Sequence, residues 1–247
     1  MEHQTLIVLS IAFLLIAILY SSVGHAGASG YLAVMALMSF PVASIKPISL
    51  VLNILVSLIA THKFLKGGCF DRKVFEVFAV TSIPMAFVGG YLKIDTHLFK
   101  VMAGLFLIVS ALLLISRQFI KSSGQVNKIN VQLALVIGAV IGWVSGLLGV
   151  GGGIFLSPII ILFGWTSVRN TSGIAALFIL CNSVVGLAGH YASLKSVPFE
   201  TIFFALFVTA GGFIGSHLGS QKFNNKVIVA FLFLVLLSAG IKFVFGG

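Results

Sequence analysis

Two long stretches of this chain contain no Asp, Glu, Lys or Arg, and glycines interrupt the middle of each one. The first stretch runs from His3 to Ile45 and the second from Ile129 to Val168. The first contains Gly-His-Ala-Gly-Ala-Ser-Gly at 24–30, and the second contains Gly-Val-Gly-Gly-Gly at 149–153. Stretches this long and uncharged are expected in the hydrocarbon layer of a membrane. The glycine clusters predict helices that stop and restart within that layer.

The composition also indicates a helical membrane protein. Hydrophobic residues make up 59% of the 247 residues and charged residues 8%, with a mean hydropathy of +1.19. The apolar runs are continuous rather than alternating, as in membrane helices. The net charge of +10 comes from Lys and Arg spaced singly between apolar runs, so no nucleic-acid partner is expected. The two cysteines and the scattered His, Asp and Glu predict neither a disulfide, a metal site nor any other cofactor.

Ten apolar segments can be counted along the chain, which predicts an all-α polytopic membrane protein. The second and seventh segments are shorter than the roughly 20 residues that a membrane-spanning helix needs. Both of these follow a glycine cluster. The approximate cores are 4–22, 29–41, 47–62, 75–92, 99–116, 131–148, 153–164, 171–192, 200–219 and 226–244.

The order of sequence features repeats between the two halves. Residues 87–92 read Phe-Val-Gly-Gly-Tyr-Leu, and residues 213–218, 126 positions later, read Phe-Ile-Gly-Ser-His-Leu. Asn53 and Asn182 also occupy comparable places in the two halves. A repeated order of features at similar offsets is typical of internal duplication.

We interpret the chain as two five-segment repeats, 1–118 and 131–247, joined by a basic linker at 119–130. If every segment crosses the membrane, the odd number of spans per repeat inverts one half relative to the other. If segments 29–41 and 153–164 are instead re-entrant, each repeat has four spans and the charge bias described next is smaller. With every segment crossing, ten of the fifteen Lys and Arg residues fall on one side, and five loop charges, Lys46 among them, fall on the other. The positive-inside rule places the ten and the linker in the cytoplasm, and both termini outside. The expected location is the cell inner (plasma) membrane, with multiple passes.

The glycine clusters are the candidate site, because a helix that restarts after a break presents unpaired N–H groups and a partial positive charge. In an inverted repeat two such starts would meet near the midplane and favour an anion. The competing explanation is that these glycines only allow close helix packing. The acidic residues lie outside the apolar cores or at their edges, which disfavours a buried proton relay. The candidate substrate-binding residues are Gly24, His25, Gly27, Ser29, Asn53, Gly149, Gly151, Gly152, Gly153, Ser172 and Asn182.

The same elements resemble the sulfite exporter TauE/SafE family of membrane permeases. The similar parts are the glycine-rich run at 149–158, a degenerate copy at 24–30, and Gly-x-x-Leu-Gly at 215–219 before a final apolar segment. The first repeat departs from the family pattern, because Ala28 stands where a third glycine is expected and His25 is inserted among small residues. The resemblance implies export or uptake of sulfite or a small organosulfonate.

We therefore predict a secondary transporter of a small oxyanion that works by alternating access, and not an enzyme. Two alternatives stay open. Gly27–Gly30 matches the Gly-x-Ser-Gly of intramembrane serine proteases, for which His190 is a candidate base. The other alternative is an uncoupled anion channel. The expected partners are the oxyanion substrate and the lipid bilayer, with a homodimer as the alternative to a monomer.

Overall fold

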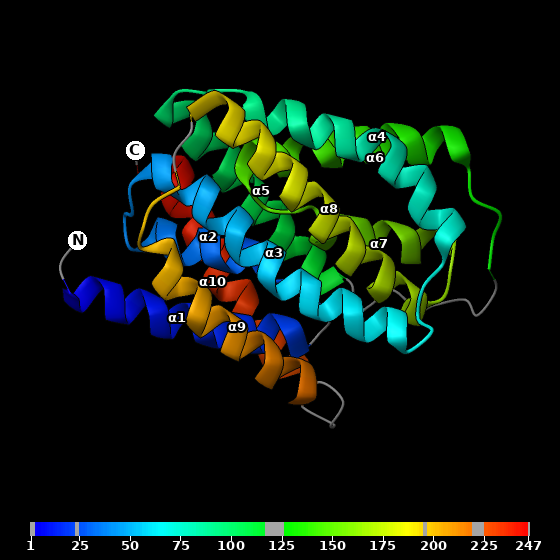
Figure 1. The fold of residues 1–247 in the computed structure, drawn as a ribbon, viewed down its shortest axis with the longest axis horizontal. Coiled ribbons are helices and arrows are strands. Elements are labelled where there is room, and N and C mark those ends of the chain that lie inside the picture. The colour runs from blue at the N-terminus through cyan, green and yellow to red at the C-terminus, as the bar shows by residue number, and fades with distance from the viewer. Residues whose placement is uncertain (1–2, 23–24, 117–125, 195–196, 219–224, 247) are drawn as a thin grey trace.

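A computed structural model describes residues 3–22, 25–116, 126–194, 197–218 and 225–246 (Figure 1). The described residues form ten α-helices and no strand, which confirms the all-α prediction. Each helix corresponds to one of the predicted apolar segments. The helices are α1 (His3–Ser22), α2 (Ala28–Leu37), α3 (Val42–Lys66), α4 (Arg72–Tyr91), α5 (Thr96–Ser116), α6 (Val131–Leu148), α7 (Gly153–Phe163), α8 (Val168–Leu194), α9 (Thr201–Leu218) and α10 (Asn225–Phe245).

Short polar residues between the apolar runs set where several helices begin. The side chains of Asp71 and Asn130 accept hydrogen bonds from backbone N–H groups in the first turns of α4 and α6. Asp95 does the same for α5, and the N–H of Leu98 lowers the pKa of that carboxyl group. Such N-caps satisfy amide groups that have no partner within the helix. At the other end of a helix, Gly149 terminates α6 in a left-handed conformation.

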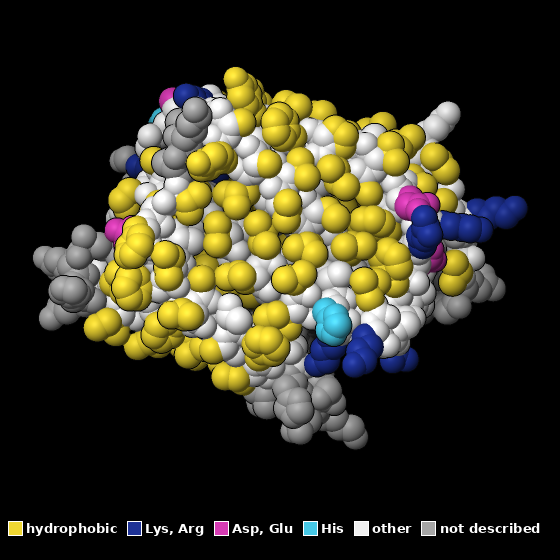
Figure 2. Space-filling model, in the orientation of Figure 1, with side chains coloured by type: hydrophobic (Ala, Val, Ile, Leu, Met, Phe, Trp, Pro, Cys, Tyr) yellow, Lys and Arg dark blue, Asp and Glu magenta, His cyan; other side chains and the backbone are white. Residues whose placement is uncertain are grey.

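The helices differ in length, and two of them are much shorter than the rest. Five of them, α3, α4, α5, α6 and α8, are long and apolar enough to cross a membrane, judged by length and composition within the described ranges. By contrast, α2 and α7 contain 10 and 11 residues. At about 1.5 Å per residue neither spans a hydrocarbon layer of about 30 Å alone. Figure 2 shows a face covered mostly by hydrophobic side chains, with Lys and Arg gathered near one end.

Glycines bring α4 and α6 into direct backbone contact. A Cβ atom added at Gly142 would lie 2.2 Å from the carbonyl oxygen of Ser82, and one added at Gly146 would lie 2.0 Å from that of Ala86. Residue numbers rise together along the two helices, so α4 and α6 run in the same direction. Gly90 of α4 makes a similar contact with α8. Small residues permit such close packing in membranes.

The second set of parallel helices contains α1, α3 and α9. Gly211 of α9 lies against Leu14 of α1, and Gly215 lies against Ile18, so these helices are parallel. Lys63, near the end of α3, donates a hydrogen bond to the carbonyl of Ser216, near the end of α9. Figure 1 shows that α3 and α9 run in one direction and α4 in the opposite one.

Each short helix lies in a connection between two parallel helices, where the chain has to cross from one end of the bundle back to the other. The start of α8 lies beside the loop after α3, because a Cβ atom at Gly173 would clash with the carbonyl of Cys69. The end of α8 lies beside the end of α4, because Gly189 contacts the backbone of Phe87 and Tyr91. Thus α6 and α8 are parallel, and the chain between them must cross back. The same holds for the connection that contains α2, between α1 and α3.

Candidate functional site

Both short helices start from a glycine in the left-handed conformation. Gly27 precedes α2 with φ 96°, and Gly152 precedes α7 with φ 77°. No side chain caps either start. Left-handed backbone is readily adopted only by glycine, which explains the two glycine clusters. Because the first amide groups of a helix have no partner within it, both starts offer N–H donors and a partial positive charge.

Other segments hold the short helices at their far ends. Lys242 donates to the carbonyl oxygen of Leu37 at 2.5 Å, where α2 ends. Asn127 donates from its side chain to the carbonyl of Phe163 at 2.9 Å and from its backbone to that of Gly164 at 2.7 Å, where α7 ends. The glycines at both helix starts are buried. The carboxyl ends of α2 and α7 are therefore fixed by neighbours, and their amino ends lie inside the protein.

The start of α7 faces buried polar side chains from three longer helices. A Cβ atom added at Gly151 would lie 3.1 Å from Nδ2 of Asn53 and 3.1 Å from Oγ of Ser183. A Cβ atom at Gly152 would lie 2.4 Å from Oγ of Ser145. We call Asn53, Ser145, Gly151, Gly152 and Ser183 the second-break cluster.

The polar side chains of this cluster lack partners within the described part of the chain. The amide nitrogen and oxygen of Asn53 and the hydroxyls of Ser145 and Ser183 are buried without a hydrogen bond. Leaving such groups unpaired costs about 1–3 kcal/mol each. Unpaired buried groups beside an uncapped helix start make this cluster the candidate ligand-binding site.

Asn182 lies next to Ser183 on α8, and its side chain is fully buried with both amide atoms unpaired. Neighbouring residues point about 100° apart around a helix, so Asn182 and Ser183 face different sides of α8. Helix α8 packs against α3, α4 and α7. Asn182 is therefore a second buried amide without a hydrogen-bond partner among the described residues, on a helix that packs against both α3 and α7.

The first glycine break, before α2, has the same left-handed glycine as the second break, before α7, but different neighbouring side chains. The hydroxyls of Tyr20 and Ser29 lie 2.8 Å apart, and the hydroxyl of Tyr31 donates to the carbonyl of Ala26 at 3.0 Å. A Cβ atom at Gly27 would lie 2.9 Å from the ring of Tyr31. The hydroxyls of two buried tyrosines thus form hydrogen bonds with polar groups around this break.

The remaining candidate substrate-binding residues in the first half of the chain are His25 and Gly24. His25 is buried, and its backbone N–H bonds to the carbonyl of Tyr20 at 2.9 Å. Gly24 lies outside the described residues.

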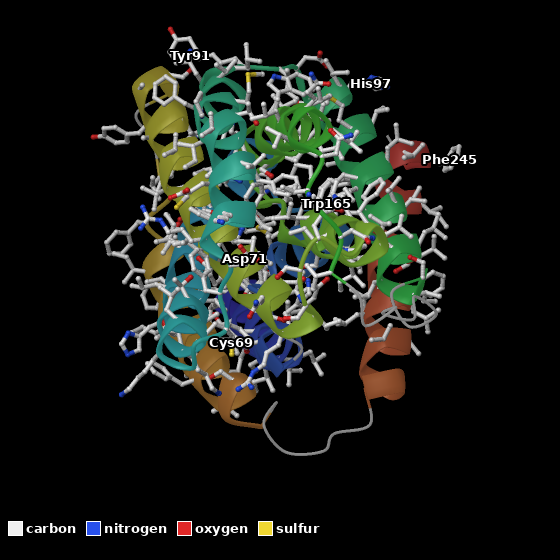
Figure 3. All side chains as sticks on the ribbon, turned by 90° about the vertical axis from the view of Figure 1, so that its right-hand side faces the viewer. Cys69, Asp71, Tyr91, His97, Trp165 and Phe245 are labelled. Carbon is white, nitrogen blue, oxygen red and sulfur yellow. The ribbon has the colours of Figure 1, made fainter. Side chains whose placement is uncertain are left out.

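In the second half of the chain, Gly149 and Gly153 flank the cluster, and Ser172 lies apart from it. Gly149 has φ 79°, and a Cβ atom at Gly153 would clash with Ile179. Ser172 is ten residues before Asn182 on α8, about 15 Å along the helix axis. It lies near the end of the molecule where Thr166 donates to Asp71 at 3.0 Å, and Figure 3 shows Asp71 near Trp165. The structure therefore does not bring Ser172 to the other candidates.

Sequence reasoning missed Ser145 and Ser183. Ser183 follows Asn182 directly, and Ser145 stands one turn before Gly149. A serine in a membrane helix usually bonds to a carbonyl of its own helix, as Ser57 does with Asn53 at 2.6 Å. The sequence therefore offers no signal that separates these two serines from the structural ones.

An apolar cavity leads to the second break. It has a volume of about 290 Å³ and lies between α5, α6 and α7. Its lining includes Phe106, Val140 and Phe155, and it reaches Ser145 and Gly152 of the cluster. Among the described residues no group of three or more His, Cys, Asp or Glu could hold a metal ion. Hydrogen bonding from neutral groups is therefore the main chemistry that the cluster offers.

Comparison with known proteins gives a consistent result. The family model described as "Sulfite exporter TauE/SafE" matches residues 9–243. The probable membrane transporter protein y4hK of Sinorhizobium fredii is 38% identical over 238 residues, 95% of this chain and 96% of the relative. The probable membrane transporter protein YunE of Bacillus subtilis is 25% identical over 81% of this chain and 80% of its own length. The probable membrane transporter protein MJ0441 of Methanocaldococcus jannaschii is 26% identical over 74% and 70% respectively. No solved structure matches the chain.

Proposed function

This chain belongs to the sulfite exporter TauE/SafE family of membrane transporters, and from that premise we propose that it is a secondary transporter of a small oxyanion. Sulfite or a small organosulfonate is the proposed substrate. The observation that carries the proposal is the second-break cluster, where an uncapped helix start meets unpartnered polar groups. The buried polar and charged side chains of the described residues include no Asp or Glu, which favours an anion over a cation.

In the proposed complex, neutral donors hold the oxygens of the anion. The first N–H groups of α7, Nδ2 of Asn53 and the hydroxyls of Ser145 and Ser183 can all donate. A helix start contributes roughly 0.3–2 kcal/mol, and hydrogen bonds to a charged group contribute about 1.5–3 kcal/mol each. After the cost of desolvating and immobilising the anion, we expect dissociation constants on the order of micromolar to millimolar. That range suits a carrier, which must release its substrate.

The helix directions support an inverted repeat and hence alternating access. In the first half α1 and α3 run against α4, and in the second half α6 and α8 run against α9. The first and third helices of the second half therefore run opposite to the first and third helices of the first half. Helices α3 and α8 hold comparable positions in the two repeats and pack against each other beside the second break. Rocking of one repeat against the other would expose the cluster to one side of the membrane at a time.

The proposed location is the plasma membrane, with the basic linker in the cytoplasm. The protease alternative needs a Ser29 that an imidazole can activate, whereas the hydroxyl of Ser29 is hydrogen-bonded to Tyr20. This favours transport without enzymatic activity. The channel alternative differs only in coupling, so transport against a gradient separates the two.

The test is flux of radiolabelled sulfite into proteoliposomes that contain the purified protein. We expect saturable uptake that protein-free liposomes lack, inhibition by other small oxyanions, and no effect of choline or glucose. Ser183→Ala should reduce this uptake, and Ser110→Ala is the matched control because Ser110 is another buried, unpartnered serine, on α5. Accumulation above the external concentration under an imposed ion gradient identifies a carrier. Absence of flux for every oxyanion tested contradicts the proposal.

A further inference from the structure

Lys46 is a buried charged residue in the first turns of α3, and it was expected to be a loop charge. Its side chain is only 8% exposed. Its ammonium group donates to the carbonyl oxygens of Gly90 at 2.7 Å, Gly89 at 3.2 Å and Leu92 at 3.4 Å. These carbonyls form the carboxyl end of α4, whose partial negative charge attracts a cation. The prediction that Lys46 lies in a loop is wrong. Lys46 lies in helix α3, and its ammonium group is buried because it hydrogen-bonds to the carboxyl end of α4.

This buried charge has no acidic counterpart among the described residues. Their buried polar and charged side chains include neither Asp nor Glu. The carbonyl dipoles at the end of α4 therefore compensate the positive charge of Lys46. Burying a charge in a membrane protein without an ionic partner is costly, and such residues usually mark an ion pathway.

Lys46 lies at the edge of the second break. A Cβ atom added at Gly149 would lie 2.8 Å from the carbonyl oxygen of Lys46 and 3.1 Å from its Cα atom. Asn53 of the second-break cluster is seven residues further along α3, about 10 Å along the helix axis. The backbone of Lys46 thus contacts the second break, while its ammonium group is held at the end of α4.

We propose that Lys46 supplies the positive charge that selects an anion at the second break. This inference rests on the proposed function. An ammonium group has three N–H donors, and the carbonyls of α4 occupy three directions around it. Lys46 therefore acts through its charge, while Asn53, Ser145 and Ser183 provide the direct hydrogen bonds. With an effective dielectric constant of about 20, a unit charge about 10 Å from an anion would change its affinity roughly tenfold.

The competing explanation is that Lys46 only fastens α3 to the end of α4. Lys46→Gln separates the two roles, because a glutamine amide can still donate to the carbonyls but carries no charge. Lys46→Arg retains the charge. Lys63→Gln is the matched control, because Lys63 is on the same helix and also donates to a helix-end carbonyl, yet is exposed.

The experiment measures KM and the maximal rate of sulfite uptake in proteoliposomes for all four proteins. We expect Lys46→Gln to raise KM roughly tenfold, with folding retained in size-exclusion chromatography. We expect Lys46→Arg and Lys63→Gln to keep KM within about threefold of wild type, a change of less than one kcal/mol.

An unchanged KM in a folded Lys46→Gln protein overturns the proposal and leaves the proposed function intact. If Lys46→Gln does not fold, Lys46→Met is measured in its place. If neither neutral variant folds while Lys46→Arg does, the charge serves the fold and the proposal is wrong. Failure of the wild-type protein to transport any oxyanion instead contradicts the proposed function.

Discussion

The hydroxyl of Tyr20 lies 2.8 Å from the hydroxyl of Ser29, so the first break already contains a partner for its serine. The second break has the same left-handed glycine and the same uncapped helix start, but its neighbouring polar side chains have no such partner among the residues that the structure describes. The two breaks thus share a backbone and differ in chemistry. This difference supports the proposal that the anion binds at the second break and that the tyrosines of the first break have a structural role.

The Tyr20–Ser29 pair can be tested by a double-mutant cycle. Ser29→Ala leaves the buried hydroxyl of Tyr20 without a partner, which should cost about 1–3 kcal/mol of stability. Adding Tyr20→Phe should recover most of that loss, because both polar groups are then gone. Thermal unfolding of the purified variants measures the cycle. A stable Ser29→Ala protein without transport would place the anion at the first break instead.

Gly151→Ala should abolish transport. The added Cβ atom would lie 2.7 Å from Cγ2 of Ile179 and 3.1 Å from both Asn53 and Ser183, in the space proposed for the anion. Gly68→Ala is the control for backbone strain, because Gly68 also has a positive φ, of 65°, but has open space around its Cβ position. Uptake assays of the two variants separate blocked space from strain. Equal losses in both would show that strain alone matters.

Gly142→Ala should impair folding rather than substrate recognition. Its Cβ atom would lie 2.2 Å from the carbonyl of Ser82, so α4 and α6 could no longer pack at their present distance. Overpacking of this kind typically costs about 1–3 kcal/mol. Gly212→Ala is the control, since its Cβ atom meets only side chains at 3.5 Å or more. A melting temperature of Gly142→Ala equal to that of Gly212→Ala would contradict the observed packing.

The predicted topology places the loop after α3 in the cytoplasm and the loop before α5 outside. Lys66→Cys should therefore be labelled by a membrane-impermeant thiol reagent only after cells are opened, and His97→Cys should be labelled in intact cells. The parent protein is the control, since Cys69 is buried and Cys181 is half-buried. The reverse labelling pattern would invert the topology.

The sequence was sufficient to predict the ten helices, because charges and glycines interrupt the apolar runs at nearly the places where the helices end. Prolines were a poorer guide, since Pro47, Pro84 and Pro158 lie inside helices. It also located both helix starts, since positive φ angles restrict these positions to glycine. It could not predict that Tyr20 would pair with Ser29, because that contact depends on how the chain turns between them. Nor could it distinguish a loop lysine from Lys46, whose burial results from tertiary contact with the end of α4.

Asn53→Leu tests the effect of the proposed site on both stability and transport. Leucine has nearly the same shape as asparagine and removes two buried polar atoms that lack partners. We expect the melting temperature of this variant to stay equal or rise, while transport is lost, because the site sacrifices stability for binding. A strong loss of stability would show that the amide holds the helices together.

The most direct test of the central claim is a sulfite titration of purified wild-type and Asn53→Leu proteins, with choline as the control ligand. Binding can be followed through the rise in melting temperature that a ligand of the folded state produces. We predict saturable stabilisation of the wild-type protein by sulfite, no stabilisation by choline, and loss of the sulfite effect in Asn53→Leu. Equal sulfite stabilisation of both proteins, or stabilisation of the wild type by choline and by no oxyanion, would contradict an anion site at the second break.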